Sequence, residues 1–267
     1  ILLLETLNEL SYLYYRVSDL DEASKYIDMA LKKGHNVRNI LPYLENNLGT
    51  IYLKQGKVDE AEEYFLKSAE GFKQLFGTMS PDYASTMNNL AAVHKHRNDL
   101  GEALDLYMKV LDMDGVLYGV NHPRYATSLN NVALLYLQLG HFSIAGKFLE
   151  QCKLIREKAL GTFHPLYIKA QNDLGVYHLI MKDTIAAMDA FDEALSAEIS
   201  HMQDVFPVLT DAQRKGYFDD TRYNIERFCS LAFSDQFINT TYATDALNHF
   251  INTKGILFYA SEKMRKL

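Results

Sequence analysis

Nine histidines are the residues of this 267-residue sequence that first suggest chemistry, because imidazole is a common metal ligand. A metal ion needs its ligands within about 2.0–2.3 Å of one point. His122 and His164 occupy equivalent places in successive copies of a repeat, and His94 and His178 do so two copies apart. Since packed neighbouring helices lie about 8–10 Å apart, such positions are too distant to share a metal ion. We therefore expect no metal site and no cofactor, and we interpret these histidines as helix caps or core residues.

The two cysteines, Cys152 and Cys229, also favour a structural role. Both fall on apolar helix faces, where a free thiol behaves as a small hydrophobic group. Neither has an evident basic or histidine partner that would activate it as a nucleophile. Glycine-rich phosphate loops, the His-Glu-x-x-His zinc motif and the Gly-x-Ser-x-Gly nucleophile motif are missing from the sequence. The sequence thus predicts no catalytic residue, and so no enzyme, within this chain.

A ladder of amide side chains is the pattern that does suggest a function. Two polar residues precede a large aliphatic position in four copies of the repeat. The earlier column holds Asn46, Asn88, Asn130 and Asn172, and the later column holds Asn47, Asn89, Asn131 and Asp173. An amide both donates and accepts hydrogen bonds, so a ladder of amides can bind an extended peptide backbone whatever its side chains are. The alternative, equally favoured by the sequence, is that these side chains bond to neighbouring helices and only hold the repeats together.

Further residues, one or two helical turns along, extend this candidate binding surface. They are Tyr12, Arg16, Lys54, Lys95 and Gln138, with Tyr15 and His96 beside them. Tyrosine and arginine are frequent anchors at protein interfaces. The cationic members favour an acidic or carboxylate-bearing ligand.

Prolines and glycines, which interrupt regular secondary structure, indicate the elements that position these residues. The five prolines are Pro42, Pro81, Pro123, Pro165 and Pro207, and three of the four intervals between them are equal. Gly77, Gly119 and Gly161 have the same spacing of 42 residues. Such regular punctuation is the mark of an internal repeat.

The columns of the aligned copies predict pairs of helices. An alanine recurs in every copy, with a bulky residue four positions later and a mostly small residue three positions after that. The alanines are Ala23, Ala61, Ala103, Ala145 and Ala187. Spacings of three and four place each set on one helical face. Small columns let two antiparallel helices approach closely, and the bulky columns fill the space beside them.

The pattern Leu-[Gly/Ala]-x-x-Tyr followed by Ala-x-x-x-Phe-x-x-Ala resembles the tetratricopeptide repeat (TPR). The Leu-[Phe/Tyr]-Gly-x-x-His-Pro junctions and the 42-residue period are similar to the kinesin-light-chain type of this repeat. The resemblance implies an all-α fold, a right-handed α-solenoid of five helix pairs followed by a helical cap. It divides the chain into an array over residues 1–200 and a capping or linking segment over 201–267. The expected repeats span about 5–38, 43–76, 85–118, 127–160 and 169–200, and the first helix of each pair lines a concave groove.

Residues 201–267 leave the repeat pattern. Thr210-Asp211-Ala212-Gln213 is a capping box that predicts a new helix, with an apolar face at Phe218, Ile225, Phe228, Cys229 and Ala232. A last helix is expected to bury Tyr242, Ala246, Leu247, Phe250, Ile251 and Leu257. The motifs Val208-Leu209-Thr210, Gln213-Arg214, Tyr217-Phe218, Ala246-Leu247-Asn248 and Thr253-Lys254-Gly255-Ile256-Leu257 resemble the segment before the peptidase of bacterial TPR–CHAT proteins. CHAT domains are caspase- and separase-like cysteine peptidases, and this resemblance implies such a domain after residue 267.

Composition excludes several other functions. The net charge of −7 and a pI near 5.7, without basic runs, argue against a nucleic-acid-binding protein. No apolar stretch approaches the roughly 18 residues of a membrane span. The absence of such signals, together with the few cysteines, favours the cytoplasm.

The sequence therefore predicts a scaffold that binds a partner protein or peptide in its concave groove, and that regulates a CHAT-type peptidase in the same protein. The alternative is an adaptor or assembly protein without a peptidase, as kinesin-light-chain-like repeats alone would imply.

Overall fold

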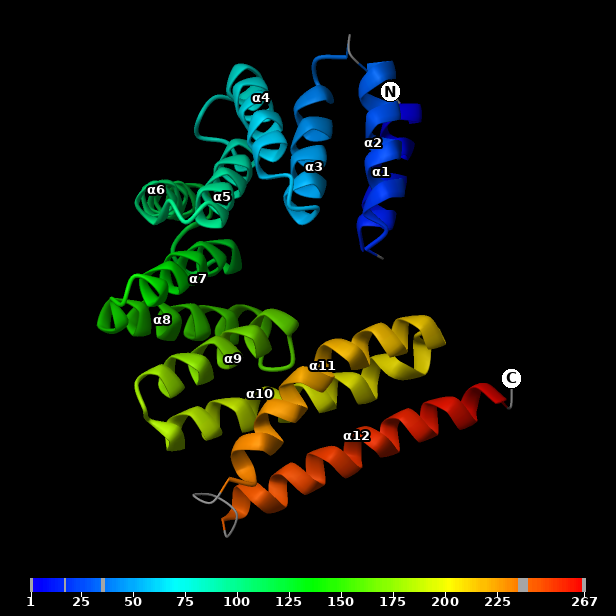
Figure 1. The fold of residues 1–267 in the computed structure, drawn as a ribbon, viewed down its shortest axis with the longest axis vertical. Coiled ribbons are helices and arrows are strands. Elements are labelled where there is room, and N and C mark those ends of the chain that lie inside the picture. The colour runs from blue at the N-terminus through cyan, green and yellow to red at the C-terminus, as the bar shows by residue number, and fades with distance from the viewer. Residues whose placement is uncertain (1, 17, 35–36, 235–239, 266–267) are drawn as a thin grey trace. The chain divides into compact units, whose positions relative to one another are not determined.

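The computed structural model describes residues 2–16, 18–34, 37–234 and 240–265, and over these ranges it contains helices and no strand. The predicted all-α repeat solenoid is confirmed. The chain divides into two compact units, Ile1–Val120 with helices α1 to α6 and Asn121–Leu267 with helices α7 to α12 (Figure 1). Among the described helices, none is long and apolar enough to cross a membrane.

Within each unit the helices follow one another in antiparallel pairs. The first helices of the pairs are α1 (Leu2–Arg16), α3 (Leu41–Lys54), α5 (Pro81–His96), α7 (Pro123–Gln138) and α9 (Pro165–Ile180). The second helices are α2 (Leu20–Gly34), α4 (Val58–Phe76), α6 (Leu100–Tyr118), α8 (Phe142–Leu160) and α10 (Thr184–Val205). A short 3-10 turn, η1 (Phe206–Val208), leads to α11 (Asp211–Ala232) and α12 (Thr241–Arg265).

Proline and histidine define where the first helices begin. Helices α5, α7 and α9 each start with the predicted proline, which fits there because the missing N–H would have no partner in the helix. The residue before the proline caps the helix. His122 and His164 each accept, through Nδ1, the backbone N–H two residues further on, at 3.1 Å in both cases. The prediction that these two histidines are capping residues is confirmed.

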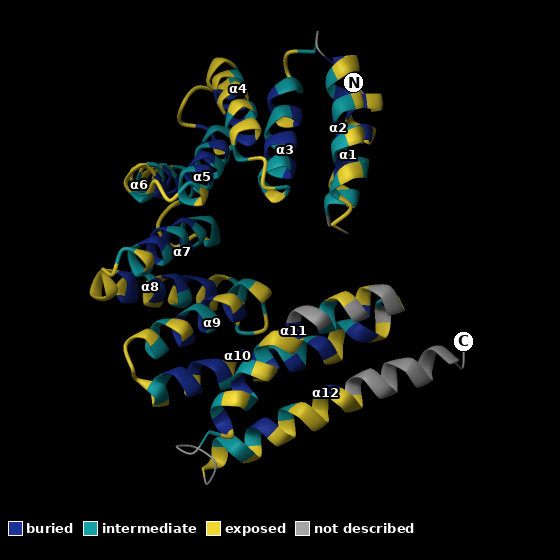
Figure 2. Ribbon diagram, in the orientation of Figure 1, coloured by how far each residue is buried: buried dark blue, intermediate teal, exposed yellow. Residues whose placement is uncertain are grey.

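The alanine column is the centre of every helix pair. All five of its members have no exposed surface. The small residue of the first helix lies against the bulky residue of the second: a Cβ added at Gly49 would stand 2.8 Å from the ring of Phe65, and one at Gly175 would stand 2.3 Å from that of Phe191. Since the two helices touch at these points, a larger side chain would push them apart. The buried faces of the helices turn toward their neighbours in this way throughout Figure 2.

Helices α11 and α12 pack on the last predicted repeat, as expected. Phe228 and Ala232 of α11 and Ala246 of α12 join the core of α10. The capping box at Thr210 and Gln213 is present. However, the predicted apolar face of the last helix is only partly buried. Leu247, Phe250 and Ile251 are 52%, 48% and 56% exposed, because α10 covers only the side of α12 that carries Tyr242, Ala246 and His249. The side chain of Leu257 lies outside the described residues.

Polar contacts supplement this packing. His249 lies 2.7 Å from Asp192 of α10, measured from Nε2 to Oδ1, and the hydroxyl of Tyr242 donates to Asp189. These contacts fix which side of α12 faces α10.

Burial of the Cys152 thiol gives a prediction about alkaline pH. Cys152 is fully buried in α8, and burial raises the pKa of its thiol to about 11 from an ordinary value of 9.0. Between pH 9.0 and about pH 11 the Cys152 thiol loses its proton in the unfolded chain and keeps it in the folded chain, so the unfolding free energy falls as the pH rises. At pH 10 we expect this thiol to lower the unfolding free energy by about 1 kcal/mol.

Cys152→Ala removes this effect and fits its column, where other repeats have Ala30 and Ala194. Urea unfolding should show a smaller loss of stability between pH 8 and pH 10 for Cys152→Ala than for the wild type. Equal losses would mean that the buried thiol does not retain its proton.

Candidate protein-binding surface

In the first unit, the asparagines of neighbouring first helices bond to one another. Asn47 Nδ2 of α3 donates to Asn8 Oδ1 of α1 at 2.7 Å, and Asn89 Nδ2 of α5 donates to Asn46 Oδ1 of α3 at 3.0 Å. The hydroxyl of Thr86 donates to the same Asn46 oxygen at 3.3 Å. We call the half-buried residues Asn8, Asn46, Asn47 and Asn89 the first amide surface. In the first unit, an asparagine of the later column thus donates to an asparagine of the earlier column on the preceding first helix.

The structure describes some, but not all, of the side chains that are predicted to extend this surface. Lys54 is exposed, with its ammonium 4.6 Å from the ring centroid of Tyr15 and 3.3 Å from the Ser18 hydroxyl. Tyr12 is 48% exposed on α1, and Lys95 is half-buried on α5. The side chain of Arg16 lies outside the described residues. Asn88 is half-buried on α5.

In the second unit, the equivalent residues are Asn130, Asn131, Asn172 and Asp173, which we call the second amide surface. Asn130 is fully buried, and its side-chain oxygen lies 3.8 Å from the Cys152 sulfur. Asn131 is half-buried. Asp173 accepts a hydrogen bond from Lys169 Nζ at 2.8 Å within α9. Gln138 lies exposed at the end of α7. Burial therefore removes Asn130 from direct contact with a ligand.

Arg227 of α11 completes the second amide surface, and sequence reasoning missed it. Its Nη2 donates to the side-chain oxygen of Asn172, just as Asn89 Nδ2 donates to the side-chain oxygen of Asn46. The guanidinium carbon of Arg227 lies 4.0 Å from the ring centroid of Phe191, and burial lowers the pKa of the guanidinium group. Phe228, next to Arg227, follows Leu174 by 54 residues instead of 42, because α10 and η1 lengthen the connection and Phe228 lies further along α11 than Leu174 does along α9. That longer interval hid the correspondence.

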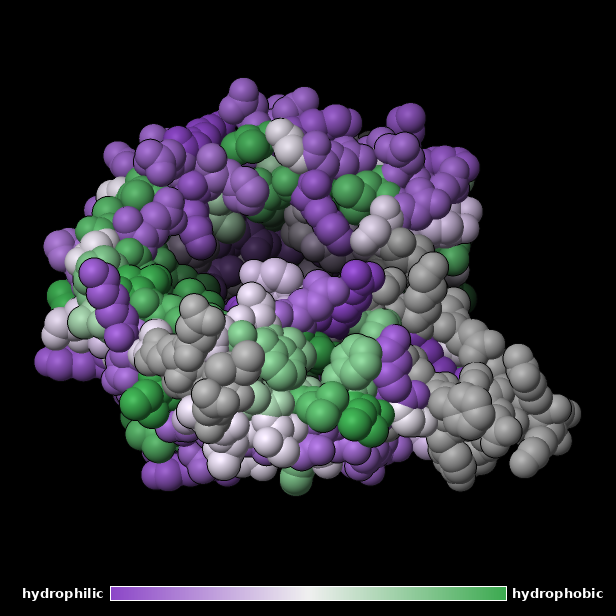
Figure 3. Space-filling view, turned by 60° about the horizontal axis from the view of Figure 1, so that its bottom comes forward, coloured by the Kyte–Doolittle hydropathy of each residue, from purple (hydrophilic) through white to green (hydrophobic). Residues whose placement is uncertain are grey.

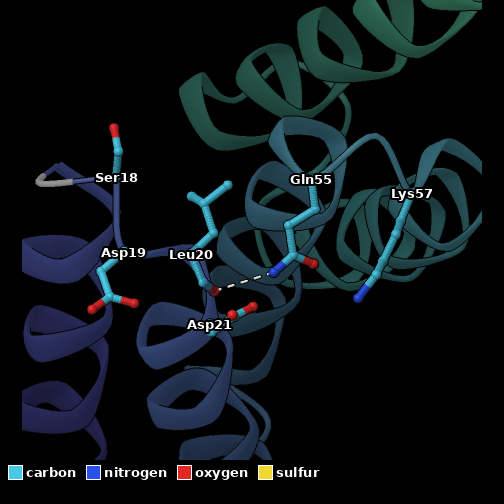
Figure 4. Close-up of a pocket in the computed structure, with 6 residues that line it drawn as sticks. All are labelled: Ser18, Asp19, Leu20, Asp21, Gln55 and Lys57. Atoms are coloured by element: carbon cyan, nitrogen blue, oxygen red, sulfur yellow. Dashed lines mark hydrogen bonds between the residues drawn. The ribbon is translucent and has the colours of Figure 1, made fainter.

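A shallow hollow at the turns of the first unit is a different kind of site (Figure 4). Ser18, Asp19, Leu20 and Asp21 line one side, and Gln55 and Lys57 line the other. Gln55 Nε2 donates to the Leu20 carbonyl at 3.2 Å and ties the two turns together. Among the described residues, no three His, Cys, Asp or Glu side chains are grouped so that they could hold a metal ion.

The amide bonds between helices lead to a stability prediction. We expect Asn46 and Asn89 to be coupled by about 0.5–1.5 kcal/mol, the net value of one hydrogen bond. The measurement is a double-mutant cycle with Asn46→Ala, Asn89→Ala and both together, followed by urea unfolding. The cycle cancels the helix propensity that alanine adds at each site. A cycle of Asn46→Ala with Lys109→Ala, an exposed residue on α6, should show no coupling. Equal coupling in both cycles would contradict the bond.

Comparison with known proteins agrees with this architecture. Residues 41–115 match one family model of the tetratricopeptide repeat, and residues 126–166 match another. No curated protein sequence matches the chain.

Several solved structures have a similar fold. A Podosopora anserina protein described as a kinesin light chain with nearly identical TPR-like repeats is 19% identical, with a TM-score of 0.60 over 74% of this chain and 95% of its own. BtubC (BKLC) from P. vanneervenii is 16% identical, with a TM-score of 0.65 over 93% and 92% of the two chains. A Rap protein complexed with Competence and Sporulation Factor is 11% identical, with a TM-score of 0.65 over 98% and 77%. At these identities the likeness concerns the fold. Residues 41–115 and 126–166 of this all-α repeat solenoid are therefore tetratricopeptide repeats.

Proposed function

We propose that this chain is a scaffold that binds a partner protein or peptide through the amide surfaces of its first helices. The observation that carries the proposal is the regular hydrogen-bonded ladder of half-buried amides in the first unit. Asn47 and Asn89 each use one N–H in these bonds, and an amide has a second N–H and an oxygen with two lone pairs. Such a side chain can hold its neighbour in place and still meet a peptide group.

The surroundings of the ladder favour a ligand with acidic groups. Lys54 is exposed beside Tyr15 at the end of α3, and the half-buried Lys95 lies near the same end of α5, one position before the equivalent of Lys54. A ladder of amides would bind the ligand backbone, and these cations would attract a carboxylate. The groove between the first helices and the residues predicted to line it, Tyr12, Arg16, Lys54, Lys95 and Gln138, belong to this proposal.

The biological role that we propose is to sense a partner and to regulate a CHAT-type cysteine peptidase that follows in the same cytoplasmic protein. The motif Thr253-Lys254-Gly255-Ile256-Leu257 supports it by its resemblance to TPR–CHAT proteins. Ligand binding would shift the packing of the helix pairs toward one arrangement and thereby bias the peptidase. An adaptor without a peptidase is the competing role, which the similarity to kinesin-light-chain structures favours.

The binding proposal is tested with peptides selected from a display library against the chain. We expect Asn47→Ala combined with Asn89→Ala to weaken the selected peptides at least tenfold in isothermal titration calorimetry, because each change removes an amide from the ladder of the first unit. The matched control is Lys109→Ala combined with Gln151→Ala, two exposed residues on second helices, which should leave binding unchanged. Unchanged binding in the asparagine variant would remove the amide surfaces from the proposal.

The regulatory role has its own test. The coding sequence after residue 267 should contain a histidine and a cysteine in a caspase-like α/β pattern. An unrelated domain, or no further domain, would favour the adaptor.

A further inference from the structure

Helices α11 and α12 repeat the pattern of the pairs before them. Phe228 occupies the aliphatic position of the first helix and is fully buried. On α12, Ala246, Phe250 and Thr253 have the spacing of the alanine, bulky and small columns, and Ala246 and Thr253 are 0% and 2% exposed. The bond from Arg227 to Asn172 is the same link that joins earlier first helices. The two helices therefore form a sixth, irregular pair.

In earlier pairs, the first helix of the following pair packs into a groove on the second helix of the pair before it, as two examples show. Leu90 and Val93 of α5 pack on Ala61 and Phe65 of α4. In the second unit, Ile225 and Phe228 of α11 pack against α10 in one core with Phe191. In each case the entering helix has large apolar residues three positions apart.

The same groove on the sixth pair lacks such a helix in the described part of the chain. It has a volume of about 380 Å³ and runs between Phe218, Ile225 and Cys229 of α11 and Phe250 of α12. Phe250 is 48% exposed, whereas its equivalent Phe191 is 2% exposed under α11. Figure 3 brings this end of the molecule forward and shows apolar side chains gathered on the face that α12 presents.

Three charged residues at the rim, Arg222, Glu226 and Lys254, bear on what the groove accepts. Glu226 occupies the position of Asn46 and Asn172, which accept hydrogen bonds from the next first helix. Arg222 Nε donates to its Oε1 at 2.6 Å, and a carboxylate can accept several more bonds. Lys254 extends over the groove, with its ammonium 5.5 Å from the ring centroid of Phe250, so its stem adds to the apolar floor.

We propose that the α11–α12 groove binds an amphipathic helix of a partner protein. The continuity of this groove with the interfaces between the preceding pairs specifies the chemistry of that helix. It has large apolar residues at i, i+3 and i+6 and a basic residue at i+2, as α11 itself has at Ile225, Arg227, Phe228 and Leu231. The basic residue pairs with Glu226, and the apolar residues cover Phe250. This site is separate from the amide surfaces and goes beyond the proposed function.

The probe for this groove is a fluorescent 22-residue peptide with the sequence of residues 211–232, in which Cys229 is replaced by serine. Fluorescence anisotropy with the full chain should show saturable binding. Phe250→Asp in the chain should weaken it at least tenfold, because the charge enters the apolar floor. Leu66→Asp, at an exposed leucine of α4, should not. Phe250 is half exposed, and circular dichroism of Phe250→Asp shows whether the fold is kept.

The charge specificity is tested by a swap. A peptide with Arg227→Glu should bind the wild-type chain at least fivefold more weakly and recover on a Glu226→Arg chain. Asn47→Ala with Asn89→Ala should leave peptide binding unchanged, which separates this site from the amide surfaces. Absence of peptide binding, or equal binding by the Phe250→Asp chain, would overturn the proposal. Self-association that Phe250→Asp abolishes in analytical ultracentrifugation would overturn it in favour of a second copy of the chain.

Discussion

The contact between a small residue on one helix and a bulky residue on its partner is the constraint on which the structure depends. Gly49 faces Phe65, and Gly175 faces Phe191, with no room for a further carbon atom between them. Where the first helix has Ala133 instead, the second has the smaller Leu149. The two columns do not compensate in volume in every pair, since Ala91 stands in the column of Gly49 and the larger Tyr107 in that of Phe65. At Gly49 and Gly175, however, the contact itself sets how closely the two helices pack.

This packing determines where the amides lie. In the first unit, each first helix is held firmly by its partner, and the asparagines of successive first helices meet within hydrogen-bonding distance. Asn47 reaches Asn8 and Asn89 reaches Asn46 because the repeats have the same internal geometry. Where α11 replaces the amide with Arg227, the link to Asn172 persists and gains a stacking contact with Phe191. A change in the packing of one pair would thus alter the hydrogen bond to the next amide, which is the physical basis of the sensing role that we propose.

Much of the fold could be predicted from the sequence, because its signals are local and repeated. Proline at the start of a helix, histidine before it and alanine at the centre of each pair each act within one or two turns, and the structure places them as expected. The surface residues were harder to assign. Whether Asn130 is buried or exposed depends on helices distant in sequence, and the sequence alone favoured neither of the two roles for the amides.

The last helix shows the same limit. Its apolar pattern predicted a buried face, but Leu247, Phe250 and Ile251 lie on the side that α10 does not cover. Apolar periodicity identifies a face that is suited to burial, and it does not specify which element buries it. Arg227 was missed because the interval to the preceding first helix differs from the repeat period.

The most direct test of the account is whether Gly49 and Phe65 share one space. Urea unfolding of Gly49→Ala, Phe65→Leu and the double variant measures this, because the double variant recreates the combination of Ala133 and Leu149. We predict that Gly49→Ala alone lowers the unfolding free energy by about 1–3 kcal/mol, since overpacked cores are destabilised by that amount. In the double variant the loss should be smaller than the sum of the single losses by at least about 1 kcal/mol. Additive losses would contradict the claim that close contact between these two residues sets the packing of the helix pair.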